Sequence, residues 1–196
     1  MTAHRQAVRL LAPNATAGDV LLDAGCGAGY FYHSLRERKV PVEYYGIDSS
    51  PALLEIGRRI LPEYGLDPDR LIAMRIEDLV AEVDHVVCIN VLSNIDNFHR
   101  PLERLLLAAR KTLILRESMA DFSSYSYVED RYLDQDVHMK VYVNTYRREE
   151  VGDFIGSYGF DVAFEQDEYT KGAPQPVIDH PHWWTFVKAT RRVEGA

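Results

Sequence analysis

The chain has 196 residues and a net charge of −8 at pH 7, with 46% hydrophobic and 27% charged residues. This length suits a single globular domain over 1–196, which can bury a core without disulfides or metals. No segment approaches the ~20 consecutive apolar residues that cross a bilayer, and the apolar run near the N-terminus is too short for a signal peptide. Acidic residues outnumber basic ones by 30 to 22, and such an acidic surface disfavours binding to the phosphate backbone of nucleic acid. We therefore expect a small-molecule partner, and neither nucleic acid nor membrane.

Two cysteines, Cys26 and Cys88, fall within or beside apolar runs. Buried free thiols are typical of a reducing compartment. The cysteine pattern therefore predicts a cytoplasmic protein.

The first half of the chain alternates between strand-like and helix-like hydrophobic spacing. Helical spacing follows Ser50 and Pro51, a residue pair that favours a helix start, and it recurs at 98–110. Short apolar runs predict strands buried on both faces at 20–25, 42–48, 71–75, 85–90 and 111–117. This alternation predicts an α/β fold with a parallel sheet and right-handed crossovers.

The second half has a different character. Residues 118–146 show no helical stripe and predict a long loop with two extended pieces. A helix is expected at about 147–158, where Gly159 is placed to end it. Two β-like segments at 160–170 and 182–191 close the chain, and the turn-rich stretch between them indicates a hairpin with a long loop.

A glycine loop, Asp23-Ala24-Gly25-Cys26-Gly27-Ala28-Gly29, follows the first predicted strand. Glycines let the backbone approach a ligand closely, and the helix behind the loop offers free N–H groups. The dinucleotide fingerprint requires G-x-G-x-x-G, whereas the spacing here is G-x-G-x-G and Tyr30 stands where the third glycine would be. The spacing of this loop therefore argues against NAD or FAD as the cofactor.

Asp48 ends the second predicted strand, one β-α-β step after the glycine loop. The carboxyl ends of neighbouring parallel strands lie side by side, so we expect Asp48 beside the loop. A carboxylate there can accept hydrogen bonds from both hydroxyls of a ribose. Alone, each feature also fits a tight turn or a helix cap, but together they favour a cofactor that contains a nucleoside.

Over VLLDAGCGAGYFYHSL and YYGIDSSPALLEIGRR the sequence resembles the class I S-adenosylmethionine-dependent methyltransferases, and the resemblance extends from about Gly18 to Arg191. It implies a Rossmann-like fold: a doubly wound, mostly parallel seven-stranded sheet whose last strand is antiparallel between its neighbours. It also implies S-adenosyl-L-methionine as the cofactor and S-adenosyl-L-homocysteine as the product. NVLSN stands in place of the Asn-Pro-Pro-Tyr type signature of members that methylate adenine, cytosine or glutamine, which argues against those substrates.

The resemblance assigns most of the cofactor site. The glycine loop would hold the methionine part, the acid at the end of strand two the ribose, and the segment 76–78 the adenine. One sequence leaves open which of the two acids in 76–78 takes the adenine amino group. The expected cofactor-binding residues are Asp23, Gly25, Gly27, Gly29, Asp48, Ser49, Ile76, Glu77, Asp78 and Asn90.

The acceptor side is less marked. Methyl transfer from a sulfonium is an in-line displacement, in which the protein positions the nucleophile and a base can assist a hydroxyl. The candidate catalytic residues are His138 and Glu117, although a structural role is an open alternative for both, with Glu117 pairing to Arg116 or a nearby base. Candidate substrate contacts are Asn94, Tyr125 and Tyr142.

The segment 118–146 is too long for an ordinary connection and carries several tyrosines, so we expect it to be an insertion that covers the substrate. A half-buried hairpin is the plainer alternative. His180 and His182 stand close to Asp179, but no further ligand at a convincing spacing appears, and no metal site is expected.

The sequence therefore predicts a cytoplasmic, S-adenosylmethionine-dependent methyltransferase that acts on an oxygen or nitrogen of a small molecule, such as a sugar or a biosynthetic intermediate, as a monomer or homodimer. One rival is an NAD(P)-binding oxidoreductase, which Tyr30 and the lack of a Tyr-x-x-x-Lys pair disfavour. The other is a non-catalytic module that binds the same cofactor.

Overall fold

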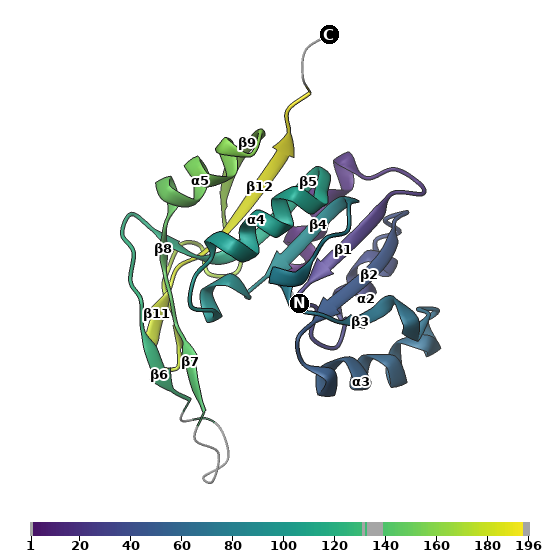
Figure 1. Cartoon of the computed structure of the whole chain (residues 1–196), viewed down its shortest axis with the longest axis horizontal. Helices are drawn as coiled ribbons and strands as arrows, with labels where there is room; N and C mark the ends of the chain where they lie inside the picture. Colours follow the sequence, from purple (N-terminus) through teal and green to yellow (C-terminus); the bar gives the residue numbers. More distant parts are fainter. Residues whose placement is uncertain (1, 131, 133–138, 194–196) are drawn as a thin grey trace.

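An eight-stranded sheet forms the centre of the computed structural model, which describes residues 2–130, 132 and 139–193 (Figure 1). The main path runs β3-β2-β1-β4-β5-β12-β9, and the short β8 pairs with β5 beside this path. The strands of this sheet are β1 (Val20–Ala24), β2 (Glu43–Asp48), β3 (Leu71–Ala73), β4 (Val83–Ile89), β5 (Ala109–Ala120), β8 (Tyr146–Arg147), β9 (Phe160–Gln166) and β12 (Trp184–Arg191).

Strands β3, β2, β1, β4 and β5 run parallel to one another. Strand β12 is antiparallel to both β5 and β9, between which it lies. The seven strands of the main path therefore form the predicted mostly parallel sheet with the predicted antiparallel last strand between its neighbours.

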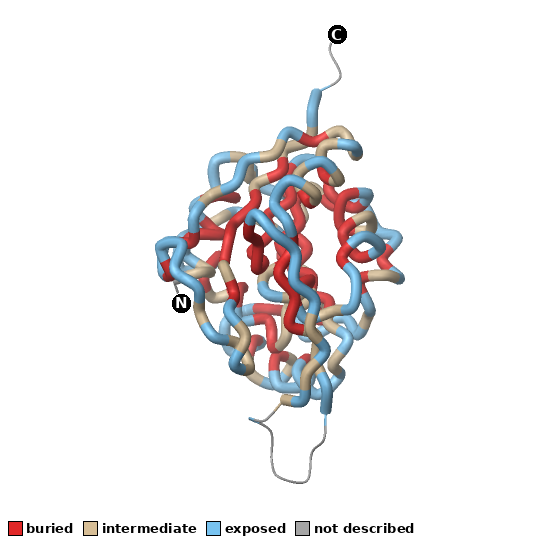
Figure 2. Tube along the Cα trace, turned by 90° about the vertical axis from the view of Figure 1, so that its left-hand side faces the viewer, coloured by how far each residue is buried: buried red, intermediate tan, exposed pale blue. Residues whose placement is uncertain are grey.

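Helices cover both faces of the sheet, as a doubly wound fold requires. Apolar residues of α1, α2 and α3 share one core cluster with the sheet, and those of α4 and α5 share the other. Figure 1 shows α4 crossing in front of β4 and β5, and Figure 2 shows the buried residues gathered in the interior. The helices are α1 (Thr2–Leu11), α2 (Phe31–Glu37), α3 (Pro51–Ile60), α4 (His99–Ala108) and α5 (Arg148–Ser157).

The start of α3 is the predicted one. The Ser50 hydroxyl accepts the N–H of Leu53 at 3.4 Å, and Pro51 occupies the first helical position. This cap satisfies one of the free N–H groups at the helix end.

Several element bounds differ from the prediction. Strand β3 stops at Ala73 because its only neighbour, β2, ends at Asp48, and a short 3-10 turn follows at Ile76–Asp78. Strand β9 stops at Gln166 because Asp167 turns inward to pair with Arg116. Strand β5 is longer than predicted at both ends, since it begins directly after α4 and continues to Ala120 beside β12 and β8.

Helix α1 is an element to which the sequence analysis assigned nothing. It buries Ala7, Val8, Leu10 and Leu11 completely or nearly so. Its Gln6 donates to the carbonyl of Gln166 at 2.9 Å and accepts the N–H of Glu168 at 2.8 Å. These contacts anchor α1 beside the end of β9.

Two short hairpins lie beyond the main sheet, side by side in Figure 1: β6 (Tyr127–Glu129) with β7 (Lys140–Tyr142), and β10 (Gln175–Val177) with β11 (His180–His182). The Tyr132 hydroxyl donates to Asp179 at 3.2 Å and so connects them. The two extended pieces predicted within 118–146 are therefore β6 and β7, while β10 and β11 occupy the long connection predicted between the last two strands.

Within the described part of the chain, no helix is long and apolar enough to cross a membrane. The same residues contain no cluster of three or more His, Cys, Asp or Glu side chains that could hold a metal. Both cysteines are free thiols.

Candidate cofactor site

A cavity of about 490 Å³ opens where the carboxyl ends of β1, β2 and β4 meet. Ligands of open α/β sheets bind at this edge. The cavity contains most of the residues that the sequence assigned to cofactor and substrate, namely Gly25, Gly27, Asp48, Ser49, Ile76, Glu77, Asn90 and Asn94.

A second cavity of about 310 Å³ adjoins the first and shares Gly25, Gly27 and Asn90 with it. Its remaining wall includes Asp23 of β1 and two residues that the sequence analysis did not select, His4 of α1 and Tyr30 before α2. Together the two cavities form one cleft, which we call the cofactor cleft.

The Asp48 carboxylate ties the two sides of this cleft together. One oxygen accepts the N–H of Gly27 at 2.8 Å, and the other accepts the N–H of Ser50 at 2.8 Å. Each carboxylate oxygen has a second lone pair, so Asp48 can accept two further hydrogen bonds from a ligand in the cleft.

Gly27 leaves room for a ligand. Its φ of +57° is one that L side chains rarely adopt, and a Cβ built on it would point into open space, with Leu53 Cδ1 the nearest atom at 3.9 Å. A ligand as large as a nucleoside can therefore approach the backbone here.

Gly29 does not belong to the cleft, although the sequence placed it among the cofactor-binding residues. A Cβ on Gly29 would lie 2.8 Å from Leu61 Cδ1 and 3.2 Å from Leu71 Cδ2. This position requires glycine because Leu61, directly after α3, and Leu71 of β3 pack against it, not because a ligand does.

Asp23 is a buried carboxyl group in the wall of the smaller cavity. It accepts a hydrogen bond from the Tyr44 hydroxyl at 2.7 Å. Burial raises the pKa of Asp23 to about 7, and the negative charge of Asp48 adds to the rise, while the Tyr44 hydrogen bond opposes it. A cationic group entering the smaller cavity would stabilise the ionised form of Asp23.

The segment 76–78 enters the cleft through its first two residues. Ile76 is buried and lines the larger cavity together with Glu77, whereas Asp78 is exposed and lines neither cavity. Arg75 donates to Glu77 at 2.9 Å and lowers the pKa of this carboxyl. Of the two acids, the geometry therefore brings Glu77 to the cleft.

Glu117 lies below the cleft instead of inside it. Its carboxylate is completely buried and accepts the N–H of Val91 at 3.0 Å, the N–H of Ser93 at 2.8 Å and the hydroxyl of Ser93 at 2.8 Å. Burial raises its pKa. In this arrangement Glu117 has no open path to an acceptor and holds the loop after β4. This is a structural role, but it rests on backbone N–H groups and Ser93 and not on the pairing with Arg116 or a nearby base that the sequence suggested.

Of the other candidates for contact with the acceptor, the structure places one in the cofactor cleft and two outside it. Asn94 lines the larger cavity and donates to the carbonyl of Asn90 at 2.9 Å. Tyr125 and Tyr142 line neither cavity. Tyr125 is 57% exposed, with its ring 6.0 Å from that of Tyr146, and the Tyr142 ring lies tilted against that of Tyr127 with their centres 4.5 Å apart. His138 lies outside the described residues.

His4 was missed because α1 was missed. Apolar residues at 3, 7, 8, 10 and 11 have helical spacing, which could have revealed the helix. The His4 ring meets that of Phe31 edge-on at 5.3 Å, and burial lowers its pKa to about 4, with the charge of Arg116 contributing. The imidazole at the cleft is therefore neutral at pH 7.

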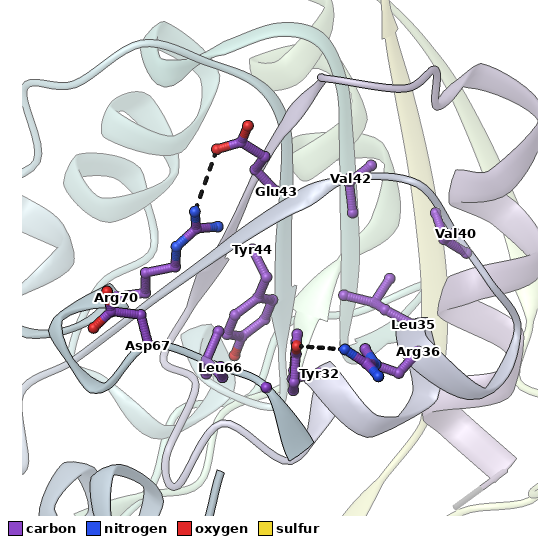
Figure 3. Close-up of a pocket in the computed structure, with 11 residues that line it drawn as sticks. Tyr32, Leu35, Arg36, Val40, Val42, Glu43, Tyr44, Leu66, Asp67 and Arg70 are labelled. Carbon is purple, nitrogen blue, oxygen red and sulfur yellow. Dashed lines mark hydrogen bonds and ion pairs between the residues drawn. The ribbon is translucent and has the colours of Figure 1, made fainter. Parts of the chain in front are cut away.

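A third cavity, of about 290 Å³, lies at the opposite end of β2 (Figure 3). Arg70 pairs with Glu43 across it at 3.5 Å, and Arg36 donates to the Tyr32 hydroxyl at 3.3 Å. Because β2 begins at Glu43 and ends at Asp48, this cavity is separate from the cofactor cleft.

Comparison with known proteins identifies the fold. A family model described as a methyltransferase domain matches residues 22–113. No curated protein matches the chain.

Three solved structures illustrate the similarity. The magnesium protoporphyrin IX methyltransferase of Synechocystis, with S-adenosylmethionine bound, is 19% identical with a TM-score of 0.66 over 96% of this chain and 80% of that one. The glycopeptide N-methyltransferase MtfA, also complexed with S-adenosylmethionine, is 13% identical with a TM-score of 0.68 over 96% and 94%. An S-adenosylmethionine-dependent methyltransferase of Clostridium acetobutylicum is 14% identical with a TM-score of 0.64 over 97% and 89%.

Proposed function

We propose that this chain is a class I S-adenosylmethionine-dependent methyltransferase that methylates an oxygen or nitrogen atom of a small molecule held in the cofactor cleft. The methyltransferase-domain model that matches residues 22–113 and the shared fold support this proposal. The observation that carries the proposal is the pairing of Asp48 with the open backbone at Gly27 in one cavity at the carboxyl edge of the sheet. Class I members use this edge for the cofactor, and the residues present fit it.

The chain's own residues would divide the work along the cleft. Asp48 would accept the ribose hydroxyls, Ile76 and Glu77 would contact the adenine, and Asp23 would face the amino group of the methionine part. When bound, S-adenosylmethionine supplies a methyl group on a positively charged sulfur. Asn90 and His4 would line the methionine end, where the acceptor has to arrive.

A small acceptor is supported by the size and charge of the cleft. The two adjoining cavities measure about 490 and 310 Å³, much of which the cofactor itself would fill. The net charge of −8 disfavours a polyanionic acceptor. The hairpin β6–β7 within 118–146 would cover the acceptor side, and the two free thiols are those expected in the cytoplasm.

The direct experiment is a screen of small hydroxyl, carboxyl and amine compounds with S-adenosylmethionine, in which S-adenosylhomocysteine is measured by mass spectrometry. We expect release that depends on both the enzyme and one class of acceptor. Binding of S-adenosylhomocysteine without turnover on any compound would favour the non-catalytic module instead.

A further inference from the structure

The side chain of Asn90 occupies a special place at the cofactor cleft. It follows β4 directly, is exposed, and lines both cavities. Its φ is +60°, in the left-handed region that non-glycine residues adopt at a cost. Such conformations persist where the surroundings enforce them, and they concentrate at ligand sites.

Hydrogen bonds from Arg116 of β5 and from Asn94 hold this one residue. The Asn90 N–H donates to the carbonyl of Arg116 at 2.8 Å, and its carbonyl accepts from Asn94 at 2.9 Å. The Arg116 guanidinium donates to Oδ1 of Asn90. Strands β4, β5 and β12, which carry or precede these groups, lie side by side in Figure 1.

Arg116 is itself held rigidly. Its Nε donates to Asp167 at 2.7 Å, and its guanidinium carbon lies 4.4 Å from the centre of the Trp184 ring. Asp167 is completely buried, and its other oxygen accepts the N–H groups of Tyr169 and Thr170 at 3.0 and 2.8 Å. A buried ion pair stabilises a fold only weakly, because desolvation of the two charges opposes their attraction. The Arg116–Asp167 pair has a second role, which is to orient Asn90.

This network determines which way the Asn90 amide points. A guanidinium only donates hydrogen bonds, so the amide must turn its oxygen toward Arg116. Its nitrogen is then directed elsewhere, and no described residue accepts a hydrogen bond from Nδ2. Asn90 therefore offers the cleft an N–H donor, while its side-chain oxygen is turned toward Arg116.

A fixed donor distinguishes oxygen from nitrogen acceptors. A hydroxyl or carboxylate oxygen has two lone pairs, so it can accept a hydrogen bond through one and attack the methyl carbon through the other. A neutral amine has a single lone pair, which must form the new bond. It therefore cannot also accept the Asn90 N–H, and Oδ1 of Asn90 is turned toward Arg116 and not toward the N–H groups of the amine.

We propose that Arg116 is a positioning residue that fixes Asn90 as a hydrogen-bond donor at the methyl-transfer site, and that the acceptor atom held there is an oxygen of a carboxylate or hydroxyl, not an amine nitrogen. This inference rests on the proposed function and narrows its acceptor class.

The test uses the full chain saturated with S-adenosylhomocysteine and three fragments of one shape: benzoate, benzyl alcohol and benzylamine. Sinefungin is avoided because its added ammonium would itself favour an anion. The readout is the side-chain amide signal of Asn90 in nitrogen-15 NMR, assigned by its loss in Asn90→Asp. Benzoate, benzyl alcohol or both should shift this signal. Benzylamine should bind at least about tenfold more weakly, the difference expected for one hydrogen bond to a charged or well-placed group.

Two variants and a control separate orientation from charge. Asn90→Asp puts an acceptor in place of the donor and should reverse the order, so that benzylamine binds best. Arg116→Met should abolish the preference of about tenfold for the oxygen fragments over benzylamine, including the preference for uncharged benzyl alcohol. The affinity for S-adenosylhomocysteine should change less than about twofold. Arg110→Met on the same strand, where Arg110 pairs with the exposed Glu82, should change nothing.

Asn90→Asp alters an exposed residue, so it decides the question even where Arg116→Met fails to fold. The inference is overturned if benzylamine shifts the Asn90 signal as strongly as the oxygen fragments, if no fragment shifts it, or if Asn90→Asp leaves the order unchanged. Absence of S-adenosylhomocysteine binding to the wild type would instead contradict the proposed function.

Discussion

At the end of β2, Asp48 serves the fold and the ligand with the same carboxylate. Asp48→Ala removes the acceptors for the N–H groups of Gly27 and Ser50 as well as those for a ribose. We expect binding of S-adenosylhomocysteine to weaken by about 1.5–3 kcal/mol, measured by calorimetry. Asp48→Asn, which keeps one acceptor oxygen, should lose less. Unchanged affinity in a folded Asp48→Ala protein would rule out the ribose assignment.

Asp23 predicts a pH dependence of cofactor binding. With its pKa raised to about 7, the carboxyl is largely protonated at pH 6, and a bound ammonium group would have to displace that proton. Affinity for S-adenosylhomocysteine should therefore rise about tenfold from pH 6 to pH 8, with proton release on binding at the lower pH. Calorimetry in two buffers of different ionisation enthalpy measures this release. An equal pH dependence in Asp23→Asn would show that another group is responsible.

Some residue roles could be predicted from the local sequence, whereas others depend on packing that only the folded structure shows. The motif spacing was enough to place Asp48 beside Gly27, and the family resemblance added Glu77 to the same cavity. It could not show that Gly29 faces Leu61, because packing between α3 and the loop is a tertiary fact. Nor could it separate a catalytic from a structural Glu117, since both fit a polar residue near the end of a strand.

At the scale of elements, Glu117 joins β5 to the loop after β4. Glu117→Gln would replace one carboxylate oxygen with an NH₂ group facing N–H donors, so we expect the free energy of unfolding to fall by about 1–3 kcal/mol in urea titrations. Glu63→Gln at the exposed surface is the matched control. Lost turnover with unchanged stability would instead support direct catalysis by Glu117.

The segment 118–146 combines an anchored base with exposed arms. At the base, the Asn144 N–H donates to the Ser93 carbonyl at 2.9 Å, and the Tyr146 hydroxyl donates to the Leu92 carbonyl at 2.6 Å. In the arms, Tyr127 is 55% exposed. We therefore propose the covering role for β6 and β7, and not for the anchored base.

Amide hydrogen exchange tests that covering role. The base at 143–147 should be protected with or without S-adenosylhomocysteine, whereas 127–129 and 139–142 should gain protection when it binds. Tyr142→Ala should keep cofactor binding and lose turnover. Tyr169, which is 63% exposed and lies outside the arms, provides the control: Tyr169→Ala should keep both cofactor binding and turnover. Arms whose exchange ignores the ligand would not be a cover.

Elements with strong periodicity were predictable, and those defined by partners were not. The buried strands β4 and β5 and the capped helix α3 follow from apolar runs and the Ser50-Pro51 signal. The end of β9 depends on the pairing of Asp167 with Arg116, which no local pattern encodes. Helix α1 had a readable stripe that was overlooked.

At the scale of the whole molecule, the strand order brings residues distant in sequence to a single edge. Parallel β1, β2 and β4 deliver the glycine loop, Asp48 and Asn90, while the inserted β12 places Trp184 against Arg116. The sequence supported this topology through its resemblance to a known family. It could not reveal the network behind Asn90, because that network requires the antiparallel strand in place.

The central claim is that the cofactor cleft binds S-adenosylmethionine through Asp48 and the open backbone at Gly27. The most direct measurement is a calorimetric titration of the wild type and Gly27→Val with S-adenosylhomocysteine and, separately, NADH. We predict one-site binding of S-adenosylhomocysteine by the wild type, none by Gly27→Val, whose side chain would fill the space beside Leu53, and no binding of NADH by either. Tight NADH binding, or equal S-adenosylhomocysteine affinity in a folded Gly27→Val protein, would contradict the account.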